Sequence, residues 1–161
     1  MKNNSSDISY LDYSITNLDS IYGTLGRTFT IEISSSDESV AAMQYINPNI
    51  FNRLQKNPFT SPSREYPVDF GYTLFDNYVL NLKIPEGYQV DELPKNAIYT
   101  VGNKDGSYLF QIAQQNDVIT LNKRFVIGKT MFLPEEYQNL RTFYDMIVAK
   151  ESEQIILKKT N

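Results

Sequence analysis

The residues that could act as acids or bases in this chain are carboxylates, lysines and tyrosines, because the sequence contains neither His nor Cys. This composition excludes the Ser-His-Asp triad, the Cys-His pair, zinc sites built on thiolate or imidazole, and every disulfide. Glu135 and Glu136 are adjacent in a predicted helix, where their side chains diverge by about 100°. Asp91 and Glu92 are predicted to lie in a solvated turn. The sequence therefore predicts no catalytic residue, no metal site and no cofactor.

Other ligand classes find little support in the residue pattern. Gly23-Thr24-Leu25-Gly26 lacks the Gly-Lys-Ser/Thr ending of a phosphate-binding loop. The formal net charge of −4 provides no basic stripe that could bind nucleic acid. No stretch approaches the ~18 apolar residues of a membrane helix, and no apolar run follows Lys2 as a signal peptide would require.

The segment Arg64–Tyr72 is the most distinctive stretch, because it combines charges with aromatic residues and a proline. Arg and Tyr are favoured binding anchors, so one interpretation makes it an interface formed by Arg64, Tyr66, Asp69 and Phe70. The simpler interpretation, which the residue types favour, is an edge strand in which Arg64 and Asp69 are satisfied by the backbone or by each other. For the 12 tyrosines, a place in the core is likewise favoured over a role in stacking on sugars.

Alternation of apolar and polar residues is the strongest structural signal along the chain. It predicts strands at Arg27–Ser34, Asn77–Ile84, Ser107–Gln114 and Val118–Ile127. The alternation in the last of these slips near Lys123-Arg124, which predicts a β-bulge.

Turn-forming residues separate the predicted strands. Asn103-Lys104-Asp105-Gly106 predicts a hairpin, because Asp and Gly tolerate a positive φ. Gln115–Asp117 and Ser35–Glu38 predict two further turns, and Pro85-Glu86-Gly87 ends the Asn77–Ile84 strand. The irregular, proline-containing segment Asn47–Arg64 is expected to loop over the surface.

A single amphipathic helix is predicted from Pro134 to about Lys150. Its apolar residues follow spacings of three, four and three, at Tyr137, Leu140, Tyr144 and Ile147. Pro134 suits the first turn of a helix, because its missing N–H has no partner to lose there. A final strand is predicted at Gln154–Leu157.

These elements predict a mainly β fold: an antiparallel β-sandwich of immunoglobulin-like type, with one C-terminal helix followed by a last strand. The chain of 161 residues has the length of one domain. We expect that domain to span residues 10–160, after a flexible N-terminus at residues 1–9.

Four stretches in order resemble a known family. They are Tyr45–Pro48, Arg64–Phe70, Ile84–Lys95 and Leu133–Tyr137, followed by Ile155–Lys159 at the end. Together they resemble the C-terminal β-domain, of unknown function, that follows the papain-like core in bacterial transglutaminase-like proteins. The resemblance implies an exported protein, periplasmic or extracellular. It carries over no catalytic residue, because the family's Cys, His and Asp belong to the core domain.

The resemblance favours a non-catalytic accessory domain that packs on or orients a transglutaminase-like core of the same polypeptide. The alternative function is that of a binding domain: a β-sandwich that binds a glycan or a cell-envelope polymer. A free-standing enzyme is a third, weaker hypothesis. Coplanar exposed tyrosines on a sheet face would favour the glycan. A bare apolar patch would favour the accessory domain.

Overall fold

The computed structural model describes residues 7–34, 42–51 and 53–160, and its contacts divide the chain into two units, Met1–Ala42 and Met43–Asn161. The sequence predicted one domain over residues 10–160. The division arises because β1 (Asp7–Thr16) and β2 (Gly26–Ser34) pair with each other and with no other described strand. The turn predicted at Ser35–Glu38 lies outside the described residues.

The N-terminal unit is an antiparallel hairpin. Its register runs from Asp7 opposite Ser34 to Thr16 opposite Gly26, with one shift between Tyr10 and Asp12. The predicted strand Arg27–Ser34 is confirmed as β2, whereas β1 was not predicted and begins inside the segment expected to be flexible. A lone two-stranded hairpin buries little surface, and large apolar side chains such as Tyr22 are accordingly exposed.

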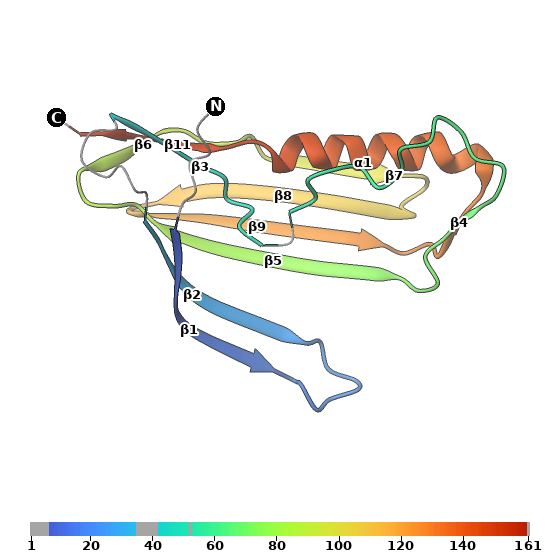
Figure 1. The fold of residues 1–161 in the computed structure, drawn as a ribbon, viewed down its shortest axis with the longest axis horizontal. Coiled ribbons are helices and arrows are strands. Elements are labelled where there is room, and N and C mark those ends of the chain that lie inside the picture. The colour runs from blue at the N-terminus through green and yellow to red at the C-terminus, as the bar shows by residue number, and fades with distance from the viewer. Residues whose placement is uncertain (1–6, 35–41, 52, 161) are drawn as a thin grey trace. The chain divides into compact units, whose positions relative to one another are not determined.

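The second unit is built on a four-stranded antiparallel sheet (Figure 1). Its order is β5 (Leu74–Lys83), β9 (Val118–Ile127), β8 (Gly106–Gln115) and β7 (Ala97–Val101). The predicted turns between these strands are confirmed, and Lys104 and Asn116 adopt positive φ of 69° and 54° there.

The predicted bulge near Lys123-Arg124 is wrong. Strand β9 pairs with both of its neighbours in an unbroken register from Val118 to Ile127. The alternation therefore continues through Lys123, which occupies an inward position and is buried. The wrong prediction arose because Lys123 is a polar residue at a core position, which interrupts the apolar pattern without any change in strand register.

A second, three-stranded sheet has the order β3 (Met43–Ile46), β11 (Ile155–Lys159) and β6 (Tyr88–Glu92). The predicted last strand is confirmed and proves to be central. The turn predicted at Asp91-Glu92 is wrong, because Ile156 of β11 pairs with Glu92 and extends the strand to that residue. A short pairing joins β4 (Val68–Asp69) to β10 (Met131–Phe132).

The predicted helix is confirmed. It begins with a 3-10 turn, η1 (Pro134–Glu136), and continues as α1 (Tyr137–Glu151). The predicted stripe is buried along α1, at Tyr137, Leu140, Tyr144 and Ile147. The structure thus has the predicted class: mainly β, with antiparallel sheets, a C-terminal helix and a final strand.

One core unites these elements. Figure 1 shows α1 and β11 running along the same side of the four-stranded sheet. Fully buried side chains come from that sheet (Phe110, Leu121), from the helix (Leu140) and from β11 (Ile155, Leu157). The opposite face of the four-stranded sheet carries the alternate residues of each strand, which point away from this core.

Candidate functional site

The four predicted interface residues differ in exposure: Arg64, Tyr66 and Asp69 are exposed, and Phe70 is half-buried. Arg64 and Tyr66 are exposed, and Tyr66 retains 78% of its accessible area. The Arg64 guanidinium lies 5.6 Å from the centroid of the Tyr137 ring, a cation–π distance. Asp69 is exposed in β4, and its Oδ1 accepts a hydrogen bond of 2.8 Å from the N–H of Gly71, which shapes a turn.

Phe70 belongs to the core instead. It is half-buried, and its ring meets the rings of Phe59 and Phe132 edge-to-face at 6.3 and 5.9 Å. The N–H of Phe70 donates to the carbonyl of Thr130 at 2.8 Å. Val68, Asp69 and Phe70 therefore alternate inward, outward and inward, so Phe70 cannot contribute its ring to a surface formed by Tyr66 and Asp69.

Other apolar residues are exposed beside the short β4–β10 pairing. Tyr72, Met131 and Leu133 retain 69%, 46% and 43% of their accessible areas. Met131 lies opposite Asp69 in the pairing. We call Tyr66, Tyr72, Met131 and Leu133 the β4–β10 surface.

An ion pair that the sequence did not predict lies inside the second unit. Lys123 Nζ lies 2.8 Å from Glu151 Oε1, and each side chain retains 4% of its accessible area. Lys123 comes from an inward position of β9 and Glu151 from the last residue of α1. Two signals could have found it: Lys123 falls in the apolar phase of its strand, and Glu151 follows Ile147 by four residues on the buried face of the helix.

The remaining polar atoms of this pair are also bonded. Glu151 Oε1 accepts the hydroxyl of Tyr108 at 3.2 Å, and Oε2 accepts the N–H of Leu54 at 2.6 Å. Lys123 also donates to Asn49 Oδ1 at 3.2 Å and lies 5.0 Å from the centroid of the Tyr78 ring. Burial, followed by the negative charge of Glu151, raises the pKa of the Tyr108 phenol far above its ordinary value.

The same network fixes the loop that follows β3. The side-chain amides of Asn47 and Asn49 both donate to the backbone carbonyl of Glu151, at 2.9 and 3.2 Å. The hydroxyl of Tyr78 donates to the carbonyl of Pro48 at 3.0 Å. Within the described residues every buried side-chain nitrogen or oxygen has a partner. This arrangement is that of a satisfied structural network, which holds a loop against the end of a helix.

A second ion pair lies at the start of the helix, nearer the surface. Lys129 Nζ lies 2.5 Å from Glu136 Oε1, and Glu136 Oε2 accepts the N–H of Leu133 at 2.8 Å. The hydrogen bond from Lys129, followed by that from the Leu133 backbone, lowers the pKa of Glu136. The reciprocal bond raises the pKa of Lys129.

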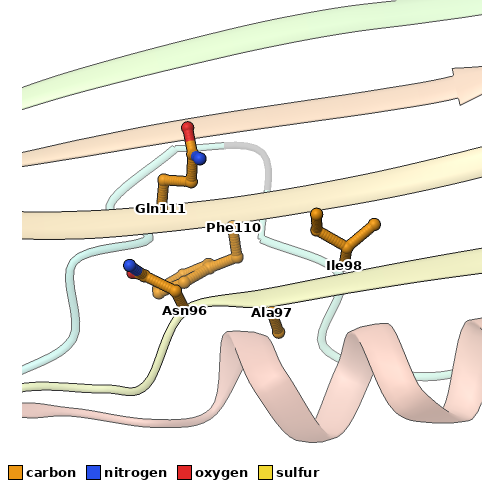
Figure 2. A pocket seen from close by; sticks show the side chains of 5 residues that line it. All are labelled: Asn96, Ala97, Ile98, Phe110 and Gln111. Atoms are coloured by element: carbon orange, nitrogen blue, oxygen red, sulfur yellow. The ribbon is translucent and has the colours of Figure 1, made fainter.

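The depressions on the second unit are shallow. One of about 300 Å³ lies at the edge of the sheet and is lined by Asn96, Ala97, Ile98, Phe110 and Gln111 (Figure 2). Its lining holds no titratable side chain, and Asn96 Oδ1 already accepts the N–H of Ile112 at 2.7 Å. This depression therefore offers no group for acid–base chemistry.

Two kinds of feature are absent from the described part of the chain. No group of three or more acidic side chains is placed to hold a metal ion there. In the same residues, no helix has both the length and the apolar character needed to cross a membrane.

Comparison with known families identifies the second unit. A family model described as a domain of unknown function with a solved structure, DUF3858, matches residues 42–157. The chain belongs to the DUF3858 family. The match begins where the contacts also divide the chain, so the family domain is the unit that contains the four-stranded sheet and the helix.

A solved structure supports the fold. A crystal structure of a "putative protease" from Parabacteroides distasonis matches with a TM-score of 0.51 and 12% sequence identity. The match covers 61% of this chain and 19% of the other, so the chain spans about a fifth of that protein. No curated protein matches the chain.

Proposed function

We propose that this DUF3858 chain is a non-catalytic accessory domain that packs on and orients a transglutaminase-like catalytic core in a longer, exported bacterial protein. The observation that carries the proposal is the β4–β10 surface, on which large apolar side chains are exposed around one short strand pair. Exposed apolar groups of this kind are typical of surfaces that another protein surface covers.

Two further features support the proposal. The sequence resembles the domain that follows the core in transglutaminase-like proteins. In addition, 61% of the chain matches a part of similar fold that makes up 19% of a much longer protein, as a module of a multidomain polypeptide would. On this proposal the protein works in the periplasm or outside the cell.

The strongest charged cluster of the unit also fits a structural domain. The carboxylate of Glu151 is buried and bonded to Lys123, Tyr108 and the backbone of Leu54. A general acid or base needs access to substrate within hydrogen-bond reach, and this carboxylate is enclosed by its own partners.

A glycan or cell-envelope polymer is the second candidate partner. The observation that favours it is the exposure of two tyrosine rings, Tyr66 and Tyr72, on the β4–β10 surface. Exposed aromatic rings provide stacking platforms with a polar edge. The two proposals differ in what covers these rings.

The test uses the full-length product of the gene that encodes this chain. We expect removal of residues 43–161, or Tyr66→Asp together with Met131→Asp, to lower the unfolding midpoint of the catalytic core and its amine-incorporation activity. Tyr45→Asp serves as the matched control, because Tyr45 is an exposed strand tyrosine (58%) outside this surface. The isolated chain should show no turnover.

An unchanged core after both perturbations would contradict the accessory role. If the isolated chain then binds a soluble glycan in a titration, and Tyr66→Asp abolishes that binding, the glycan-binding proposal takes its place.

A further inference from the structure

The outer face of the four-stranded sheet is unusual in its charges. Its outward positions on β5, β9, β8 and β7 include two cations, Lys83 and Arg124, and no Asp or Glu. The whole chain has 19 acidic and 15 basic residues, so acidic residues are depleted on this face. The only acidic residue of β5, Asp76, belongs to the opposite phase of the alternation.

The same face exposes apolar side chains. Phe75, Val79 and Ile98 retain 56%, 54% and 70% of their accessible areas. Phe75 pairs across the strands with Val126, and Ile98 pairs with Leu109, so apolar groups lie opposite one another at the end of the sheet where β5 begins. Depletion of acidic residues together with an exposed aromatic ring and an Arg is typical of a protein interface.

Arg124 lies within this apolar end. Its guanidinium is 5.1 Å from the centroid of the Phe75 ring, and its strand neighbours are Asn77 and Leu109. Over the described ranges Arg124 forms no ion pair. An Arg that stacks on an aromatic ring keeps its donor groups in a fixed plane, which suits recognition of a carboxylate.

We propose, building on the accessory role above, that the outer sheet face is covered by the catalytic domain of the same polypeptide, and that Arg124 binds a carboxylate of that domain. The proposal commits to a tethered partner whose surface is apolar with an acidic group.

The size of the face supports a tethered partner. Four strands about 4.8 Å apart, with up to ten residues of about 3.3 Å each, form a face on the order of 600 Å². Covering it buries roughly 1,200 Å² in total, which is typical of contacts between domains of one chain and at the lower limit for separate proteins.

The charges argue against a second copy as the partner. Two copies packed face to face would place Arg124 and Lys83 against a face whose charged residues are all cationic, with no acidic residue to neutralise them. Like charges opposite each other disfavour such an interface.

The absence of Cys allows a direct test of coverage. Asn122→Cys places a thiol at an exposed outward position of β9, between Val79 and Gln111. Asn139→Cys, on the exposed side of α1, is the matched control. The rate of maleimide labelling is measured by mass spectrometry on the peptide that carries each thiol, in residues 1–161 alone and in the full-length gene product.

We expect the labelling rate of the thiol at position 122 to fall by a factor of about ten or more in the full-length protein. A docked face is open only about 10% of the time or less, and only the open state reacts. The thiol at position 139 should react equally in both. Arg124→Glu should restore fast labelling at position 122, whereas Arg124→Lys should restore it only in part. The unfolding midpoint of the isolated chain should be unchanged by both Arg124 variants.

Equal labelling of position 122 in both proteins overturns the proposal, as does slow labelling in the isolated chain. Slow labelling that persists in Arg124→Glu overturns the role of Arg124. A thiol at position 66 separates the two proposals. If Tyr66→Cys is protected while position 122 is free, the accessory role stands and the sheet-face inference fails. If neither is protected, both fail.

Discussion

Removing the charge of Lys123 should destabilise the DUF3858 domain more than any single surface substitution. Lys123→Met keeps most of the side-chain volume but leaves the Glu151 carboxylate buried without its cation, while its bonds from Tyr108 and Leu54 remain. Loss of one partner from a buried ion pair costs about 3–5 kcal/mol. That is a large part of the ~5–15 kcal/mol by which a domain is stable.

The measurement is equilibrium unfolding in urea, followed by circular dichroism. With a slope of about 2 kcal/mol per molar urea, the midpoint should fall by about 1.5–2.5 M. Lys129→Met is the matched control: it also removes one lysine from an ion pair, but that pair is partly exposed, so its shift should be much smaller.

A double-mutant cycle shows whether the ion pair itself is responsible. Glu151→Gln alone should destabilise the domain, because Lys123 is then buried without its carboxylate. The double variant Lys123→Met/Glu151→Gln should lose less than the two single variants added together, by about 0.5–3 kcal/mol. A shift for Lys123→Met no larger than that for Lys129→Met would refute the reasoning, and strictly additive single variants would show that the two charges do not interact.

Three further predictions concern the helix and its surroundings. Leu140→Ala should cost about 2–5 kcal/mol, because Leu140 is fully buried; Asn139→Ala on the exposed side is its control, and an unchanged urea midpoint for Leu140→Ala would contradict the packing. The pKa of Glu136 is lowered from its ordinary value of 4.5, so its ionised carboxylate stabilises the fold above pH 4.5, and this stability is lost as the pH falls. Glu136→Gln should therefore flatten the decline of the thermal midpoint below pH 5. A midpoint curve parallel to that of the wild type would disprove this. Burial raises the pKa of Tyr144 to about 12 from 10.0, so the folded state retains a proton that the unfolded chain loses above pH 10. Tyr144→Phe should therefore make the loss of stability at alkaline pH shallower. Identical curves of the thermal midpoint between pH 9 and 11 for the variant and the wild type would exclude this.

The sequence predicted the elements that depend on local pattern. The long strands β8 and β9 and the helix α1 each carry a periodicity sustained over about ten residues or more, and the turns between them contain residues that tolerate a positive φ. The short strands β3 and β6 were missed because neither carries a long alternation. They exist because β11, which is distant in the sequence, supplies their hydrogen-bond partners.

The candidate site was harder to predict for a similar reason. The sequence marked Arg64–Tyr72 as distinctive but could not show that Phe70 turns inward against Phe59 and Phe132. The buried pair of Lys123 and Glu151 joins a strand to the end of a helix. Only the tertiary fold brings those two positions together, although each interrupts an apolar pattern in its own element.

The buried network has a consequence for a domain that orients its neighbour. Glu151 binds the loop that follows β3 through Asn47 and Asn49, and β3 is itself paired with the last strand, with Met43 opposite Lys158. The first and last strands of the family domain are therefore held side by side on one core. The start of the family domain is thus anchored to its core, because β3 and its following loop are fixed by hydrogen bonds from both β11 and α1. On the accessory-domain proposal, Lys123→Met should then weaken the orientation of the attached core as well as the stability of the domain, because Lys123 donates to Asn49 Oδ1 and pairs with the Glu151 carboxylate that accepts the N–H of Leu54.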